Sequence, residues 1–237
     1  MVPIGKGETV DLEKSSSVPN IRIPPIDASA PTKTETATFA LGCFWGPDSR
    51  FGIVAGVVRT RVGYSGGTKK FPTYHSLGDN AETVKIDYDP TQISYEEMLD
   101  IFWHNHNPAE RPWSRQYMSI VFYHNEEQKR LAVKTRTRQR TRIKGKVFTE
   151  IIPACEFYLA EAFHQKYWLR RVPDLVEEFN AMYPDPDDFI ASKAVARVNG
   201  YLGGYGTFAA LQIELNGFGL SIGGNKKLLD IVYALEH

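Results

Sequence analysis

Cysteine is scarce in this chain of 237 residues, which has only Cys43 and Cys155. Two cysteines exclude the disulfide framework of a small secreted domain, and they suit a reducing compartment. Apolar runs are short, because none approaches the roughly 20 residues of a membrane span. The N-terminus lacks the charged-then-apolar pattern of a secretory signal. We therefore expect a soluble cytoplasmic protein without a membrane partner.

Excess charge of either sign is absent too. The 28 basic residues balance the 28 acidic ones, so the formal net charge is zero. Global charge thus gives no reason to expect a nucleic acid or an anionic membrane as partner. One basic run, 129–146, has no interleaved aromatic residues and is interpreted as a solvated helix face. Salt-dependent binding to a mixed oligonucleotide would test the alternative of nucleic-acid binding.

The chain divides into three parts by composition. Residues 1–33 are rich in serine and proline with little apolar periodicity, which predicts a flexible N-terminal arm. Regular apolar patterns run through residues 34–172, which form the expected catalytic domain. Residues 173–237 are a C-terminal extension of uncertain role, with helices expected over 174–179, 191–202 and 209–215.

The middle part predicts an α+β fold. Period-two or apolar runs predict strands, and amphipathic or capped segments predict helices. The expected strands cover 37–41, 57–64, 82–88, 118–123 and 147–152, and the expected helices cover 47–54, 94–103, 126–142 and 160–170. This order favours a two-layer α/β sandwich, plait-like, with a mixed sheet. A mostly helical C-terminal extension follows it.

The segment Gly-Cys-Phe-Trp-Gly at 42–46 lies where a predicted strand passes into a predicted helix. Backbone N–H groups and the helix dipole at such a place stabilise a thiolate, so we expect a lowered pKa for Cys43. Flanking glycines allow a sharp turn and a close approach of substrate. The alternative is that Cys43 is a small buried hydrophobe, as most free cysteines are.

This segment resembles the signature of the class A methionine sulfoxide reductases, the peptide-methionine (S)-S-oxide reductases. Further segments are similar to that family, and the likeness covers roughly residues 36–171. They are Val62-Gly63-Tyr64-Ser65-Gly66-Gly67, Pro72-Thr73-Tyr74, Asn80-Ala81-Glu82, Ser94-Tyr95-Glu96, Phe102-Trp103-x-x-His106-Asn107-Pro108, Gln116-Tyr117-Met118-Ser119 and Ala160-Glu161-Ala162-Phe163-His164-Gln165-Lys166-Tyr167. The family fold is also a two-layer α/β sandwich.

The resemblance implies a role for each matched residue. Cys43 would attack the sulfoxide sulfur, and Glu82, with a pKa raised by burial, would protonate the oxygen. Two phenols, Tyr74 and Tyr117, would hold that oxygen. Phe44 and Trp45 would form the pocket for the methyl group. Each residue also has a purely structural alternative: Glu82 as a surface glutamate at a strand start, and the four aromatic residues as core.

Two departures from the family pattern bear on the mechanism. Where the family places an aspartate five residues before the second tyrosine, this chain has Pro112, and Glu110 is the candidate substitute. No cysteine follows Cys155, which precedes an extended segment, so a resolving cysteine in the tail is missing. Cys155 could resolve Cys43 only if their Cα atoms come within about 7 Å. We expect an external thiol reductant, thioredoxin or glutathione-like, and an inert Cys155.

The expected function is reduction of methionine S-sulfoxide, free or in oxidised proteins, through a Cys43 sulfenic acid. No bound cofactor or metal and a monomeric state are expected. Two alternatives keep the fold: a catalytically silent module that binds methionine peptides, and another thiol oxidoreductase, such as a peroxide-reducing one. A metal hydrolase is disfavoured, because His104 and His106 lie two apart on a predicted helix and do not share a face.

Overall fold

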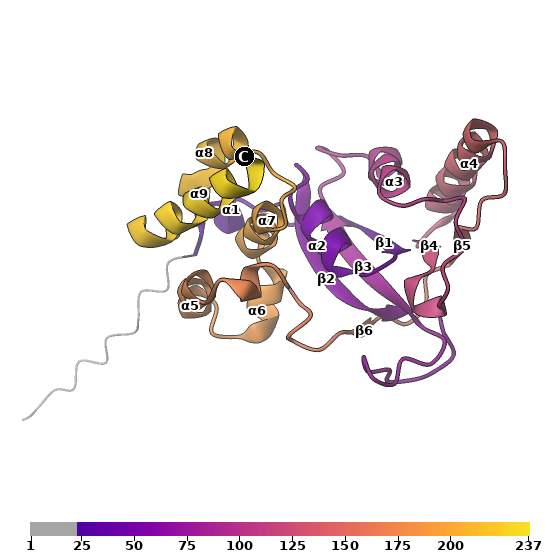
Figure 1. Ribbon diagram of the computed structural model, residues 1–237, viewed down its shortest axis with the longest axis horizontal. Helices are drawn as coiled ribbons and strands as arrows, with labels where there is room; N and C mark the ends of the chain where they lie inside the picture. The colour runs from indigo at the N-terminus through magenta and orange to yellow at the C-terminus, as the bar shows by residue number, and fades with distance from the viewer. Residues whose placement is uncertain (1–22) are drawn as a thin grey trace, which may run out of the picture.

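The computed structural model of the protein describes residues 23–237. Its centre is a six-stranded sheet in the order β5-β4-β1-β3-β2-β6 (Figure 1). The strands are β1 (Glu35–Leu41), β2 (Val57–Ser65), β3 (Ala81–Tyr88), β4 (Ser119–Tyr123), β5 (Glu150–Pro153) and β6 (Tyr158–Leu159). Only β4 and β5 pair in parallel, and the other neighbours are antiparallel. The predicted mixed sheet is confirmed.

The strands of the sheet present apolar side chains on both faces. Along β1, Phe39 points into one core and Ala40 into another. The Phe39 core is closed by α2 (Trp45–Gly52), α3 (Tyr95–His104) and α4 (Glu126–Ile143). α3 begins at a capping box of Ser94 and Glu97, as the sequence predicts.

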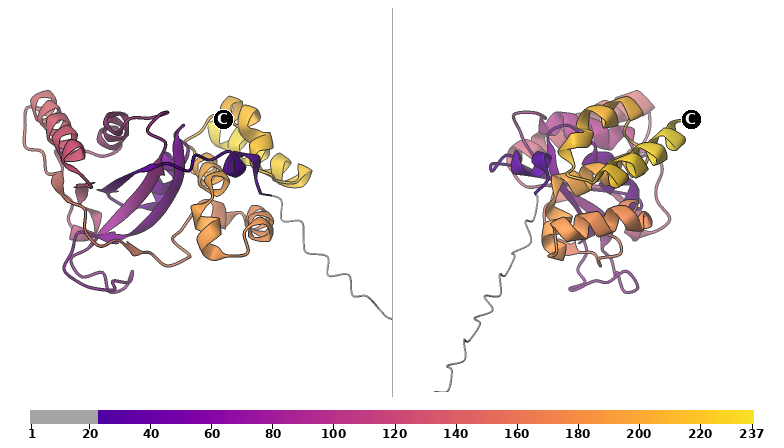
Figure 2. Two further views of the ribbon diagram at one scale, coloured as in Figure 1. Left: turned by 180° about the vertical axis from the view of Figure 1, so that it is seen from behind. Right: turned by 90° about the vertical axis from the view of Figure 1, so that its left-hand side faces the viewer.

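The C-terminal extension is a packed helical unit with its own apolar core. It comprises α5 (Pro173–Met182), α6 (Pro186–Ala191), α7 (Lys193–Leu202), α8 (Phe208–Glu214) and α9 (Ile222–Glu236). Figures 1 and 2 show it at one end of the sheet, with α7 beside α2. Large side chains such as Phe179, Phe189 and Tyr201 fill its interior. α2 therefore lies between the sheet and this unit.

The described part of the N-terminal arm is docked on this unit, which differs from the expectation of a flexible arm over residues 1–33. Residues 1–22 lie outside the described part of the chain. Within residues 23–33, α1 (Pro25–Ala28) presents Asp27, whose carboxylate accepts hydrogen bonds from Tyr183 Oη (2.8 Å) and Ser192 Oγ (2.9 Å). The backbone N–H groups of Lys193 and Ala194 also donate to it, so Asp27 caps the start of α7.

The helix predicted over 160–170 does not form, and turns followed by a 3-10 segment, η2 (Leu169–Arg171), take its place. Hydrogen bonds to residues distant in the sequence hold the backbone of this segment instead. Lys166 adopts φ 55° and its N–H donates to Asp48 Oδ2 at 3.1 Å. Its ammonium group is fully buried and lies 2.8 Å from Asp48 Oδ1 and 2.6 Å from Thr60 O. These bonds join α2 to β2 and outweigh local helix propensity.

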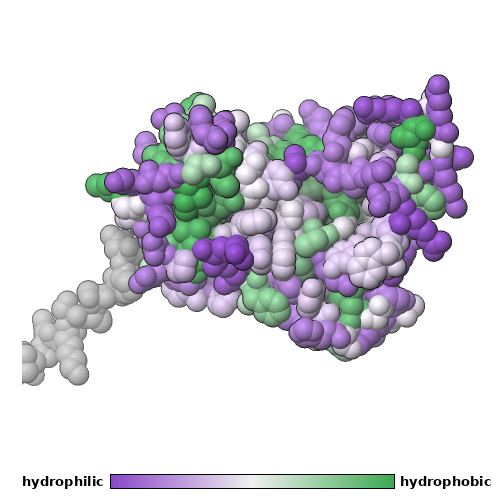
Figure 3. All heavy atoms as spheres, in the orientation of Figure 1, coloured by the Kyte–Doolittle hydropathy of each residue, from purple (hydrophilic) through white to green (hydrophobic). Residues whose placement is uncertain are grey.

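Apolar surface gathers over the C-terminal unit (Figure 3). Ile213 on α8 and Ile222 on α9 are among its most exposed large apolar side chains. Across the described residues, no helix combines the length and apolar character needed to cross a bilayer.

A glycine at the α2–α7 contact sets how closely these helices approach. A Cβ atom on Gly52 would lie 2.5 Å from the carbonyl oxygen of Ala196. We expect Gly52→Ala to lower the free energy of unfolding by about 1–3 kcal/mol, because the backbone of α7 must move. Urea unfolding measures this. Gly145→Ala is the matched control, since its new Cβ would meet nothing closer than 3.6 Å; equal stabilities of the two variants would contradict the tight contact.

Candidate active site

Cys43 lies in the turn between β1 and α2, as the sequence predicts. Gly42 makes the turn with φ 87°, a conformation that favours glycine. The side chain of Cys43 is exposed and borders two hollows, which share only Cys43 and Leu41 among their lining residues.

The larger of these two hollows is a cleft of about 360 Å³, which we call the Tyr117 cleft. Its lining residues are Leu41, Gly42, Cys43, His106, Asn107, Glu110, Pro112, Trp113, Tyr117 and Ser119. The structure thus brings Cys43 together with Tyr117 and Glu110. Trp113 is 87% exposed at the rim.

Glu82, at the start of β3, is 2% exposed and touches the Cys43 turn. Its Oε2 accepts a hydrogen bond from the N–H of Phe44 at 3.0 Å, and its Oε1 accepts one from Gln116 Nε2 at 2.6 Å. Burial raises the pKa of Glu82, while the two hydrogen bonds, which favour the carboxylate, offset part of that rise. Glu82 is therefore a buried acid that is hydrogen-bonded to the residue directly after Cys43.

The pKa of Cys43 is raised, which corrects the expectation of a lowered value. The chief cause is burial of the thiol among the surrounding protein, although one side of the residue faces solvent. The backbone N–H of Trp45 lowers the pKa, as expected at a helix start, but the negative charge of Glu82 adds to the rise. The helix terminus is thus outweighed by desolvation and a neighbouring carboxylate.

Tyr117, in the 3-10 segment η1 (Arg115–Tyr117), belongs to the same electrostatic cluster. Its pKa is raised first by burial and then by the charges of Glu82, Tyr74 and Cys43. Tyr74 lies in the loop between β2 and β3, where its backbone N–H donates to Glu161 at 2.9 Å. Tyr117 lines the cleft beside Cys43, whereas Tyr74 lines neither hollow at the thiol.

Phe44 and Trp45 pack together with residues from the segment after β6. Phe44 is buried against Tyr64 and His164, with ring centroids 5.9 and 5.1 Å away. Trp45 stacks on Tyr167 at 3.7 Å and donates its Nε1–H to His164 Nδ1 at 3.1 Å. Both aromatic residues sit in this aromatic cluster, and their role in holding a methyl group stays a prediction.

Sequence reasoning assigned no role to two residues at the site, Gln116 and His164. Gln116 holds the Glu82 carboxylate, and His164, 1% exposed, joins Trp45 to the ring of Tyr74 at 4.7 Å. Both lie inside segments that carry the family resemblance. Their place in these segments is the feature of the sequence that points to them, but their contacts depend on the tertiary fold.

Cys155 lies elsewhere, on the segment before β6. It is exposed, and its Sγ is 3.4 Å from Ser65 Oγ on β2. It lines neither hollow beside Cys43, and both cysteines are free thiols.

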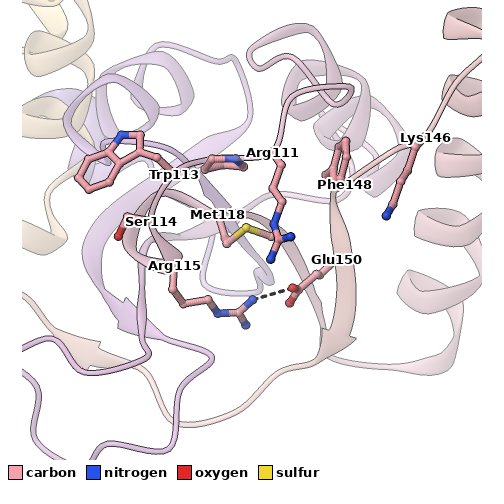
Figure 4. A pocket seen from close by; sticks show the side chains of 9 residues that line it. Arg111, Trp113, Ser114, Arg115, Met118, Lys146, Phe148 and Glu150 are labelled. Carbon is pink, nitrogen blue, oxygen red and sulfur yellow. Dashed lines mark hydrogen bonds and ion pairs between the residues drawn. The ribbon is translucent and has the colours of Figure 1, made fainter.

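A larger hollow of about 500 Å³ adjoins the Tyr117 cleft at Pro112 and Trp113 (Figure 4). Its side chains include Arg111, Lys146 and the ion pair of Arg115 with Glu150 at 2.6 Å. No cysteine lines this larger hollow, whereas Cys43 lines the smaller Tyr117 cleft. Within residues 23–237, no group of three or more His, Cys, Asp or Glu side chains is placed to hold a metal ion.

Residues 35–195 match the peptide methionine sulfoxide reductase family. The chain is 41% identical over 217 residues to a peptide methionine sulfoxide reductase of Drosophila melanogaster, covering 89% of this chain and 87% of the relative. It is 44% identical over 148 residues to peptide methionine sulfoxide reductase MsrA of Methanosarcina acetivorans, covering 58% and 79%. The Drosophila alignment must therefore extend into the C-terminal unit, beyond residue 195.

Two solved structures are similar to this chain in fold. Methionine sulfoxide reductase A of Corynebacterium diphtheriae superposes with a TM-score of 0.54 at 28% identity, covering 61% of this chain and 77% of that one. Reduced Mxr1 of Saccharomyces cerevisiae gives 0.55 at 28% identity, covering 61% and 88%.

The charge of Glu82 makes a testable contribution to the acidity of Cys43. In a Cys155→Ser background, we expect Glu82→Gln to shift the midpoint of iodoacetamide alkylation to lower pH, because a carboxylate that disfavours the thiolate is gone. Alkylation rates across pH measure the shift. Glu110→Gln is the control, since Glu110 lines the cleft but does not raise the thiol pKa. A midpoint that stays fixed in Glu82→Gln would contradict this coupling.

Proposed function

Because the chain belongs to the peptide methionine sulfoxide reductase family, we propose that it reduces methionine S-sulfoxide with Cys43 as the nucleophile and Glu82 as the acid. The observation that carries this assignment is the Glu82 carboxyl group. It is buried, has a raised pKa and is hydrogen-bonded to the residue after Cys43. A methionine sulfoxide bound beside Cys43 needs such a proton donor on the side where the sulfoxide oxygen lies.

In the first half-reaction, the Cys43 thiolate attacks the sulfoxide sulfur while Glu82 donates a proton to the oxygen. Tyr117, which borders the cleft, and Tyr74 donate hydrogen bonds to that oxygen. The products are methionine and a Cys43 sulfenic acid, so the oxygen moves from substrate to enzyme. The charge of Glu82 helps to raise the pKa of Cys43, so the thiolate forms more readily when Glu82 holds its proton, and this is the pairing that the reaction uses.

In the second half-reaction, an external thiol reduces the sulfenic acid. One thiol forms a mixed disulfide with Cys43 and releases water, and a second thiol displaces Cys43 from it. We propose a thioredoxin or glutathione-like reductant, supported by the placement of Cys155 beside Ser65 rather than at either hollow of Cys43. No bound cofactor takes part in this scheme.

Phe44 and Trp45 are proposed to seat the methyl group, and Glu110 to position the polar part of the substrate from the rim of the cleft. The open cleft suits sulfoxides in proteins as well as free methionine sulfoxide, so the proposed role is repair of oxidised proteins. We further propose that the protein is cytoplasmic, because two free cysteines suit a reducing compartment. We also propose that it is a monomer.

Two substitutions test the catalytic assignment. We expect Cys43→Ser to abolish turnover of methionine S-sulfoxide with dithiothreitol. We expect Glu82→Gln to lower kcat/KM by about 100-fold or more, the usual effect of losing a general acid, and to remove the fall in rate that accompanies deprotonation of Glu82 as pH rises. Glu97→Gln, at the surface cap of α3, is the matched control. Turnover by Cys43→Ser would refute the nucleophile, and a normal rate in Glu82→Gln would place the proton donor elsewhere.

Cys155 offers a separate prediction. We expect Cys155→Ser to keep steady-state turnover with dithiothreitol or thioredoxin within about twofold of wild type, because an external thiol resolves the sulfenic acid. Measured rates with both reductants check this. A large loss with thioredoxin alone would make Cys155 the resolving thiol.

A further inference from the structure

The second hollow beside Cys43 has a volume of about 220 Å³ and brings the C-terminal unit to the thiol. We call it the Arg50 hollow. Its lining residues are Leu41, Cys43, Gly46, Pro47, Arg50, Phe51, Asn105 and Tyr205. Among them, only Tyr205 comes from the C-terminal unit, and only Arg50 carries a charge.

Arg50 is held in place without an ion pair to a carboxylate. Its guanidinium carbon lies 4.1 Å from the centre of the Tyr205 ring, in a cation–π contact. Within residues 23–237, every ion pair is made by other side chains, so no carboxylate neutralises Arg50. Arg50 is half-buried and preorganised, and no side chain or carbonyl among the described residues accepts a hydrogen bond from its guanidinium.

The position of Tyr205 is fixed by the fold. It follows Gly203 and Gly204 at the end of α7, where its N–H donates to Gly200 O at 3.2 Å. Gly204 has φ 78°, and a Cβ atom on Gly206 would lie 2.3 Å from the ring of Tyr201, so this loop is closely packed. The hydroxyl of Tyr205 reaches to 3.3 Å from a Cβ position at Gly46, next to the helix start.

The chemistry of the second half-reaction needs an approach that the Tyr117 cleft does not offer. The sulfenic oxygen forms on the side of Glu82 and Tyr117, where its proton donors are. A thiolate that displaces this oxygen as water attacks the Cys43 sulfur from the side opposite the sulfur–oxygen bond. The Arg50 hollow also borders Cys43, but Tyr117 does not line it, and its volume of about 220 Å³ admits a small thiol.

We propose that Arg50, supported by Tyr205, binds the carboxylate of a small anionic thiol that reduces the Cys43 sulfenic acid. The inference rests on the proposed function, since it concerns the reductant of the same cysteine. A planar guanidinium matches a carboxylate in bidentate geometry, and a ligand held there places its sulfur next to Cys43. The sulfur of the small thiol forms a disulfide bond with the Cys43 sulfur, and the hydroxyl group of the sulfenic acid takes a proton and leaves as water. A second small thiol then attacks this mixed disulfide, which frees the Cys43 thiol and forms the disulfide of the two small thiols.

The test measures reduction of the sulfenic acid alone. In a Cys155→Ser background, one equivalent of hydrogen peroxide oxidises Cys43 to the sulfenic acid and releases water, so the test does not depend on sulfoxide reduction. Second-order rate constants are then measured with 3-mercaptopropionate, which carries a carboxylate, and with neutral 2-mercaptoethanol. The quantity of interest is the ratio of the two rate constants, because intrinsic reactivity of each thiol cancels between variants.

We expect Arg50→Gln to lower this ratio by about tenfold or more, the effect of losing a bidentate, charge-assisted contact with the carboxylate. Tyr205→Leu should lower it as well, whereas Tyr205→Phe, which keeps the ring under Arg50, should retain it. Arg136→Gln, on the surface of α4, is the control for net charge. An unchanged ratio in Arg50→Gln would overturn the proposal.

The carboxylate of free methionine sulfoxide is the alternative ligand for Arg50. Single-turnover rates with free methionine S-sulfoxide and with its carboxamide separate the two. If Arg50→Gln changes the ratio of these rates rather than that of the thiols, the hollow serves the substrate and the assignment to the reductant is overturned. If wild-type protein reduces neither sulfoxide, the proposed function itself fails, which the peroxide experiment distinguishes.

Discussion

The buried carboxyl group of Glu82 is the contact on which the site depends. Three segments distant in sequence meet at its two oxygens: β3 carries it, the turn after β1 donates the Phe44 N–H, and η1 donates the Gln116 amide. A buried carboxyl group with two donors specifies one geometry, because losing either donor leaves a polar group unpaired away from water. The same burial that makes this contact costly also raises the pKa of Glu82, which favours the protonated form of this carboxyl group.

A second constraint ties the C-terminal unit to this centre. α2 begins beside Cys43, and Asp48 on it is bonded to Lys166 and to Asn199 Nδ2 at 3.3 Å. Close backbone approach at Gly52 then seats α7 against α2. The extension is therefore continuous with the site, and it brings Tyr205 to the edge of the thiol. A unit remote from Cys43 in the sequence contributes one wall of the hollow through which we propose the reductant enters.

Local patterns predicted the sheet and the main helices well. The strands containing Phe39 and Val84 and the capped helix at Ser94 depend on alternation and capping, which are properties of neighbouring residues. The helix expected over 160–170 failed because Asp48 binds the backbone of Lys166, a contact between residues more than a hundred positions apart. The raised pKa of Cys43 could not be predicted for the same reason, since it depends on burial and on Glu82. Family resemblance pointed to Glu82 and the tyrosines, but Gln116, Arg50 and Tyr205 emerge only from the packing.

The central claim is that Cys43 takes the oxygen of methionine S-sulfoxide. It is tested most directly by a single turnover without added thiol, using equal amounts of protein and of the S or R epimer of a dabsylated methionine sulfoxide. The account predicts one equivalent of methionine product from the S epimer only, and a protein heavier by one oxygen in the peptide that contains Cys43. Product with a loss of two hydrogens would instead show a disulfide between Cys43 and Cys155. Absence of product from both epimers would contradict the claim.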